Sequence, residues 1–233
     1  MSILRRTMKK ILSLADDFTE KYNGKLIPTD EAVKLLKALV IKYAALEIVS
    51  PHGKSPIALF ESPCAATAEN PSAVKELCIF VGEPHASYTV RNSPNRARYI
   101  SEEEAIRILE TKNAKGHVHY LCFAESKHGP FYAICNCCPG CCVTIKSDIG
   151  KKSMLIPAGY IALVNPHKCI GCGQCMEYCP FGAMSLRDKR MRIDPKRCMG
   201  CGVCTNKCRK DALSLVPNKK HPAPLTPDKL LGD

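Results

Sequence analysis

The sequence of 233 residues lacks any long apolar run. Near its N-terminus an arginine pair precedes the short apolar run 11–15, which Asp16 and Asp17 end. An export signal needs about 7–15 apolar residues, and a membrane-spanning helix needs about 18–20. Neither is present, so we expect a cytoplasmic protein without a membrane span.

Several motifs of common enzymes are also missing. The sequence contains no glycine-rich phosphate-binding loop, no dinucleotide-binding fingerprint and no motif around a serine nucleophile. Acidic residues are in deficit, with 22 Asp and Glu against 34 Lys and Arg and a formal net charge of +12. The excess is densest in residues 161–216, which hold 10 basic and 4 acidic residues. This charge favours an acidic partner, with nucleic acid as the competing interpretation.

Cysteine, by contrast, is abundant. The chain has 16 cysteines, although a chain of this length can bury a substantial core without disulfide bonds. Cytoplasmic thiols stay reduced, and clustered cysteines there indicate metal binding or redox catalysis more often than structural disulfides. The spacing of the cysteines therefore carries the functional information.

The remaining pattern predicts an α+β protein in four segments. Residues 1–133 form a mostly helical module that ends in a β-hairpin, residues 134–160 a cysteine-rich box and connector, residues 161–216 a compact domain, and residues 217–233 a flexible tail. We expect helices over 8–22, 30–47, 70–77 and 101–116, strands over 57–60 and 143–146, an irregular basic connector over 83–99, and a hairpin over 117–135.

The helix over 101–116 is the best defined of these elements. Ser101 and Glu104 form a capping box, and Gly116 follows the helix end. A helix that leads into a hairpin is similar to the second half of a winged-helix module. His117 and His119 share one face of the first hairpin strand, where such a pair could flank a metal but more often belongs to a half-buried surface.

Residues 161–216 contain an internal repeat with an offset of 29 residues. The segment VNPHKCIGCGQCMEYCPFGAMSL aligns without a gap to IDPKRCMGCGVCTNKCRKDALSL. Each copy carries the spacing Cys-x2-Cys-x2-Cys-x3-Cys. The cysteines are Cys169, Cys172, Cys175 and Cys179 in the first copy and Cys198, Cys201, Cys204 and Cys208 in the second.

This repeat resembles the bacterial-type ferredoxins that hold two [4Fe-4S] clusters. The resemblance implies a ferredoxin-like domain of pseudo-two-fold ββ/α architecture whose two halves exchange their fourth cysteine. Cluster I would be held by Cys169, Cys172, Cys175 and Cys208, and cluster II by Cys198, Cys201, Cys204 and Cys179. Two zinc ribbons are the competing structural interpretation, but four cysteines in so short a run suit them poorly.

One position departs from the family pattern. Pro180 follows the fourth cysteine of the first copy, as is usual in the family, but Arg209 follows that of the second. A cation beside Cys208 would favour the more negative, reduced state of cluster I and raise its potential. The alternative is an arginine on a solvated surface.

A second group of cysteines lies outside the repeat. The octapeptide at 135–142 contains Cys135, Cys137, Cys138, Cys141 and Cys142, and a type II turn at Pro139–Gly140 would bring Cys138 and Cys141 together. Three hypotheses follow: a third iron–sulfur or metal site, a dithiol or persulfide box that exchanges electrons with the clusters, or a structural zinc knuckle. The candidates for a distant ligand are Cys64, Cys78 and Cys122.

The resemblance implies an electron-transfer protein rather than a stand-alone enzyme, and the basic excess favours redox partners that present an acidic docking surface. One rival hypothesis is an oxidoreductase whose reaction centre is the box at 135–142. A weaker one is a redox-sensing regulator that binds nucleic acid through the basic excess and the winged-helix-like half.

Overall fold

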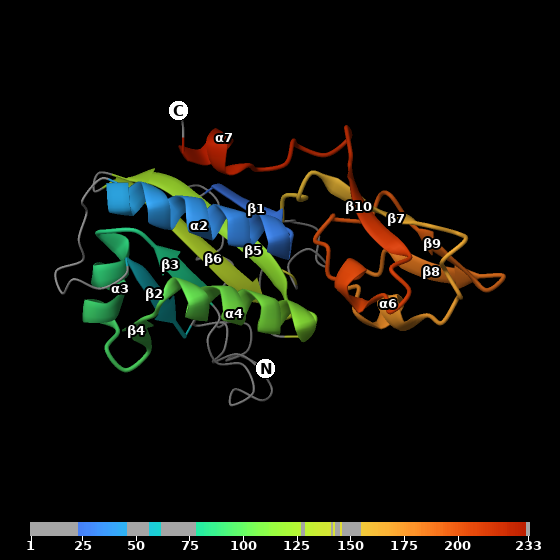
Figure 1. The fold of residues 1–233 in the computed structure, drawn as a ribbon, viewed down its shortest axis with the longest axis horizontal. Helices are drawn as coiled ribbons and strands as arrows, with labels where there is room; N and C mark the ends of the chain where they lie inside the picture. The colour runs from blue at the N-terminus through green and yellow to red at the C-terminus, as the bar shows by residue number, and fades with distance from the viewer. Residues whose placement is uncertain are drawn as a thin grey trace, which may run out of the picture.

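The computed structural model describes residues 23–45, 56–61, 78–126, 129–140, 142, 145 and 155–231. It contains a larger part, built from a sheet and helices, and a smaller part rich in turns, which lie side by side (Figure 1). Helices and strands share each part, so the fold class is α+β, as the sequence predicts. Within the described ranges, no helix is long and apolar enough to cross a membrane.

The larger part is organised around a six-stranded antiparallel sheet. Its central hairpin pairs two long strands over their whole length. In spatial order the strands are β1 (Asn23–Ile27), β5 (Val118–Ser126), β6 (Gly129–Cys137), β3 (Cys78–Val81), β2 (Ile57–Phe60) and β4 (Ala97–Tyr99).

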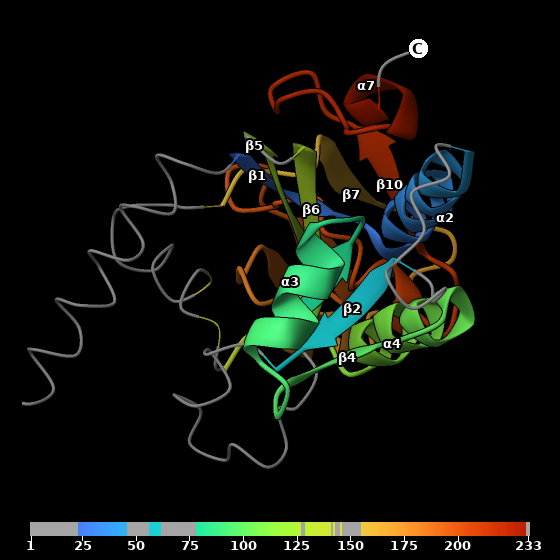
Figure 2. The ribbon, with the colours of Figure 1, turned by 90° about the vertical axis from the view of Figure 1, so that its left-hand side faces the viewer.

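Helices cover one face of this sheet. Helices α2 (Thr29–Ala45) and α4 (Glu102–Ala114) lie together on that face, as Figure 2 shows, and α3 (His85–Asn92) packs near β2 and β4. Apolar residues of α2 recur at helical spacing, and Leu35, Leu36 and Leu39 are all buried against strand residues such as Ile134. Alternate strand residues that face the helices complete this core because successive side chains of a strand point to opposite faces.

The opposite face of the sheet packs against the smaller part. Strand residues Val118, Tyr120 and Cys137 are buried there in one cluster with Cys201 and Val203 of the second repeat. A backbone hydrogen bond joins Leu26 N to Ile156 O at 2.9 Å, and another joins Ala158 N to Met199 O at 3.0 Å; the first fastens residues 155–158 to the sheet and the second fastens them to the second repeat. This sheet face therefore forms a shared core with the cysteine repeat.

The smaller part is built by exchange between the two repeats. Strand β7 (Tyr160–Val164) of the first copy pairs with β10 (Leu213–Pro217) of the second, and β8 (Met184–Arg187) pairs with β9 (Arg190–Ile193). Each two-stranded sheet thus takes one strand from each copy. Short helical turns, α6 (Gln174–Glu177) and η3 (Thr205–Lys207), follow the cysteine loops. This arrangement is the pseudo-two-fold ββ/α architecture that the resemblance implies.

The C-terminal segment differs from the flexible tail that the sequence predicts. Asn218 N donates to Gly159 O at 2.9 Å, and Lys25 Nζ donates to Pro222 O at 3.0 Å. Leu225 packs against the helix-covered core, and helix α7 (Pro227–Leu231) lies against α2 (Figure 1). The composition of this segment is polar and rich in proline, but the contacts that hold it come from elements almost the whole chain length away.

Other predicted elements have mixed outcomes. The helices over 30–47 and 101–116, the strand over 57–60 and the hairpin are confirmed, and Ser101 Oγ accepts from Glu104 N at 3.1 Å as the capping box requires. The helices over 8–22 and 70–77 and most of the strand over 143–146 lie outside the described residues.

Two expectations for the first segment are wrong. The irregular connector over 83–99 contains α3 and β4, and the helices of this segment pack on a six-stranded sheet whose edge strand β1 has no counterpart in the prediction. The hairpin is the centre of that sheet rather than the wing of a winged-helix module. The boundary at 133/134 also falls inside β6, so Cys135 and Cys137 belong to the sheet.

Candidate cluster sites

Four cysteines line a cavity in the first half of the repeat domain. Its volume is about 220 Å³. The cysteines are Cys169, Cys172, Cys175 and Cys208, of which the last comes from the second copy. The pKa of Cys175 is raised by burial and further by the neighbouring thiols of Cys208, Cys172 and Cys169. The structure therefore brings together the same four residues that the resemblance assigns to cluster I.

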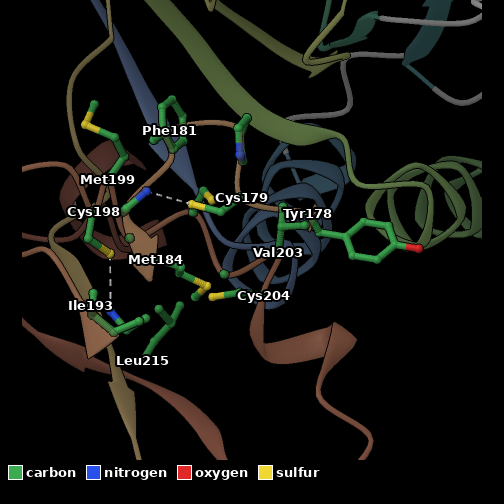
Figure 3. Close-up of a pocket in the computed structure, with 16 residues that line it drawn as sticks. Tyr178, Cys179, Phe181, Met184, Ile193, Cys198, Met199, Val203, Cys204 and Leu215 are labelled. Carbon is green, nitrogen blue, oxygen red and sulfur yellow. Dashed lines mark hydrogen bonds between the residues drawn. The ribbon is translucent and has the colours of Figure 1, made fainter. Parts of the chain in front are cut away.

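A second, smaller cavity is lined by the other four cysteines (Figure 3). Its volume is about 20 Å³. The cysteines are Cys179, Cys198, Cys201 and Cys204, of which the first comes from the first copy. Figure 3 shows Cys179 and Cys198 with apolar neighbours, among them Met184, Ile193 and Leu215. This is the grouping that the resemblance assigns to cluster II.

The backbone has the same conformation at equivalent repeat positions beside the two cavities. Gly171 and Gly200, at equivalent positions, both have φ of +68°. A Cβ atom on Gly171 would lie 2.2 Å from Lys189 O, and one on Gly200 would lie 2.2 Å from Tyr160 O. Only glycine combines this left-handed conformation with so close an approach of neighbouring backbone. The tight loops that gather the cysteines therefore depend on glycine at these two positions.

Backbone N–H groups point at the sulfurs of the exchanged cysteines. Ala183 N donates to Cys179 Sγ at 3.4 Å, and Ala212 N donates to Cys208 Sγ at 3.3 Å. Ala162 N also donates to Cys198 Sγ at 3.5 Å (Figure 3). Such donors stabilise negative charge on a sulfur.

The thiols of the second cavity are poor acids in this environment. Burial raises the pKa of Cys201 to about 12, and burial followed by the neighbouring thiols raises the pKa of Cys204 further. Four thiolates crowded in an apolar cavity would repel one another, whereas a cationic metal core removes that cost and deprotonates its ligands. The four-cysteine donor sets and the N–H groups fit the ligation of an iron–sulfur cluster. In the described ranges, no three His, Cys, Asp or Glu side chains converge to hold a single metal ion.

The two cavities differ in their surroundings. Cys172 of the first cavity is exposed, whereas its equivalent Cys201 is 9% exposed. Ile170 beside the first cavity is 62% exposed, while the equivalent Met199 packs against the shared core. The first site therefore opens to solvent, and the second is covered by the sheet of the larger part.

Polar contacts also hold the larger part against the second repeat. Asn206 Nδ2 donates to Asn113 Oδ1 at 2.7 Å, Lys207 Nζ donates to Ala114 O, and the same ammonium lies 4.1 Å from the centroid of the Tyr178 ring. The two hydrogen bonds join η3 to the end of α4. No sequence signal identified them, because they join residues about ninety positions apart.

The cysteines of the box at 135–142 have different thiol neighbours in the structure. Cys135 lies opposite Cys78 on the neighbouring strand, with 3.0 Å between their Sγ atoms, and it also interacts with Cys122. Cys137 interacts instead with Cys142. Hydrogen bonding to Cys122 and burial raise the pKa of Cys135, and hydrogen bonding to Cys142 and burial raise that of Cys137. These five thiols occupy the sheet face that meets the second cavity.

The predicted turn in the box is wrong in its type. A type II turn needs a positive φ at Gly140, which is not among the residues with positive φ. The turn is one residue longer and is closed by Cys142 N, which donates to Cys138 O at 2.9 Å. Cys138 is partly buried, while Cys64 and Cys141 lie outside the described residues.

His119 is buried rather than half-exposed. Its Nε2 lies 3.1 Å from Thr29 Oγ1, and the side chain is 1% exposed. Burial lowers the pKa of His119 to about 4, so the ring is neutral at physiological pH. His117 is partly buried and its Nδ1 lies 3.3 Å from Asn136 O. The His119 ring, which contacts Thr29, therefore faces helix α2.

Comparison with known families supports this description of the repeat domain. Residues 168–212 match the 4Fe-4S dicluster domain family, and the match contains all eight cysteines of the repeat. A comparison with curated proteins finds no match. The repeat domain is therefore an iron–sulfur domain of the ferredoxin kind, attached to a sheet domain whose family the comparison does not identify.

Proposed function

We propose that this protein is a ferredoxin-like electron carrier with two [4Fe-4S] clusters. The observation that carries the proposal is the pair of cavities, each lined by three cysteines of one repeat and the fourth cysteine of the other. A [4Fe-4S] cluster held by four thiolates supplies one-electron chemistry. The chain supplies ligands, N–H donors to the sulfurs and an apolar enclosure.

The eight ligands follow from this grouping. Cluster I is held by Cys169, Cys172, Cys175 and Cys208, and cluster II by Cys198, Cys201, Cys204 and Cys179. Metal analysis of anaerobically purified protein should give about eight irons and eight acid-labile sulfides per chain. A preparation that binds only zinc overturns the proposal, and about four irons overturns the second cluster.

The open first site is where we infer that a redox partner docks. Ile170 offers an exposed apolar contact beside the cavity, and Arg209 and Lys210, both exposed, line the same cavity. This combination fits an acidic partner with an apolar contact near its own redox centre. Nucleic acid is the competing partner for the basic surface. Strong, sequence-selective and salt-dependent binding to duplex DNA would favour it.

The cysteines on the sheet suggest that the protein has more than the two cluster sites. The sequence predicts a third site from three of Cys135, Cys137, Cys138, Cys141 and Cys142 with a distant ligand, and the contacts of Cys135 with Cys78 and Cys122, two of the candidate distant ligands, support this hypothesis. An iron content near twelve would indicate a third cluster of the same kind. We place the protein in the cytoplasm, where such thiols and clusters stay reduced.

A further inference from the structure

Two cysteines on adjacent strands of the sheet lie closer than their separation in the sequence suggests. Cys78 of β3 and Cys135 of β6 are directly opposite in the antiparallel register, 57 positions apart in the chain. Their Sγ atoms are 3.0 Å apart. Directly opposite residues have Cα atoms about 4.5–5.5 Å apart, which lies within the range that a disulfide tolerates. The sulfurs need to approach by only about 1 Å to reach the bonding distance.

The surroundings of this pair connect it to the second cluster site. Cys78 is 7% exposed, and Cys135 packs against the cluster of buried residues that also contains Cys137 and Cys201. Cys201 lines the second cavity. Buried side chains that pack against one another therefore connect the thiol pair to that cavity.

We propose that Cys78 and Cys135 form an internal dithiol–disulfide couple that exchanges electrons with the iron–sulfur centre of the second site. In the oxidised form the two sulfurs share an S–S bond. Its reduction takes up two electrons and two protons, breaks that bond and forms two S–H bonds. The electrons arrive singly from reduced iron–sulfur centres, one from each site, and the protons come from solvent. Oxidation of the dithiol is the reverse.

The dithiol–disulfide couple would increase the number of electrons that the protein can store. Each ferredoxin site handles one electron, whereas a disulfide takes two. The protein would then hold about four reducing equivalents instead of about two. This inference rests on the proposed function, because the clusters are the reductant. Cys122, a third thiol beside Cys135, is diagonal to it in the strand register rather than opposite, so it is not the paired thiol.

The first experiment detects the bond directly. The anaerobic holoprotein is equilibrated at a series of potentials, quenched in acid, alkylated and digested, and the peptides are identified by mass spectrometry. We expect a peptide pair joined through Cys78 and Cys135 at high potential, which disappears at low potential with a two-electron dependence. If that pair is absent at every potential, the proposal is wrong.

The second experiment counts electrons by coulometric titration. The intact protein should take up about four electrons, and Cys135→Ala, which removes one thiol of the pair, should take up about two. Cys122→Ala is the matched control, because it removes a buried thiol of the same sheet face and should still take up about four. Equal uptake by Cys135→Ala and the intact protein, with iron unchanged, overturns the couple.

Iron content separates this inference from the proposed function. If the intact protein holds no iron–sulfur cluster, the proposed function fails, whatever the thiols do. If it holds about eight irons but shows no linked peptide, only the couple fails. Should Cys135→Ala not fold, Cys78→Ala provides the same test from the opposite strand, and the peptide analysis of the intact protein needs no variant.

Discussion

The two cavities have the same cysteine spacing but different surroundings. At equivalent repeat positions, Gln174 is half-buried whereas Val203 is fully buried, and the exposed Ile170 corresponds to the packed Met199. The first site faces solvent and a basic rim, while the second meets the thiol-bearing face of the sheet. The duplication thus supplied two equivalent sites, and the sheet domain made them unequal.

This asymmetry has a functional consequence. Electron transfer with a partner requires an accessible site, and the first cavity meets that requirement. The second shares a buried core with thiols of the sheet, among them Cys135 and Cys137 of β6. The geometry suits a sequence in which electrons pass from a partner to the first site, then to the second, and then to the sheet.

The largest expected effect comes from removing equivalent ligands. Cys172→Ala and Cys201→Ala should each reduce the iron content by about half, because each removes one ligand of one cluster. Cys201 is also part of the shared core. We therefore expect Cys201→Ala to lower the unfolding midpoint by roughly 5–10 °C more than Cys172→Ala. Iron analysis and thermal unfolding followed by circular dichroism measure the two effects, and equal midpoints would contradict the covered second site.

Substitutions at two equivalent glycines test whether the larger part covers the second site, without removing a cluster ligand. Gly173 has φ of +78° and open space where a Cβ atom would lie, whereas Gly202 has φ of +79° and a Cβ there would lie 3.2 Å from Leu215 Cδ1 and 3.4 Å from Pro28 Cβ. Alanine at either position costs about 1–2 kcal/mol from the left-handed backbone. Gly202→Ala should cost roughly 1 kcal/mol more, because its methyl group crowds the interface.

Chemical denaturation of both alanine variants gives this difference. Gly173→Ala is the matched control for the backbone term. If the two variants have the same free energy of unfolding, the contact between the second repeat and Pro28, the residue before α2, does not contribute to the stability of the protein.

The charge beside the first site should affect its potential. Arg209 lines the first cavity and not the second. Arg209→Ala should lower the potential of cluster I by roughly tens of millivolts, since it removes a cation that favours the reduced state. Redox titration followed by EPR can separate the two clusters. Lys219→Ala removes the same charge at an exposed position outside both cavities and should leave both potentials unchanged.

The smallest expected effect concerns the basic rim. Reduced protein should transfer electrons to a small anionic oxidant faster than to a cationic one of similar potential, by roughly 2- to 5-fold at low salt. Added salt should remove the difference, and Arg209→Ala combined with Lys210→Ala should reduce it. Stopped-flow kinetics measures these rates. An unchanged preference in the double variant would place the docking surface elsewhere.

Local patterns predicted a large part of this protein. The capping box at Ser101, the amphipathic helix α2 and the hairpin followed from short-range rules, and the family match confirms the dicluster segment that the cysteine spacing predicted. Strands β1 and β4 were missed because they are short and draw their stability from pairing with other strands, and the short helix α3 was missed because it is held by packing on β2, β3 and β4. Local propensity has little influence on such elements.

The amino-acid sequence by itself determined the two sets of four cysteines, because ligand spacing is a property of a short loop and the repeat displays it twice. Only the tertiary structure decided which site is covered and which thiols of the box meet. Strand register places Cys78 opposite Cys135, and the packing of the sheet on the second repeat buries Cys201. Both depend on contacts between residues far apart in the chain, whose pairing is set by the burial of whole faces rather than by local spacing.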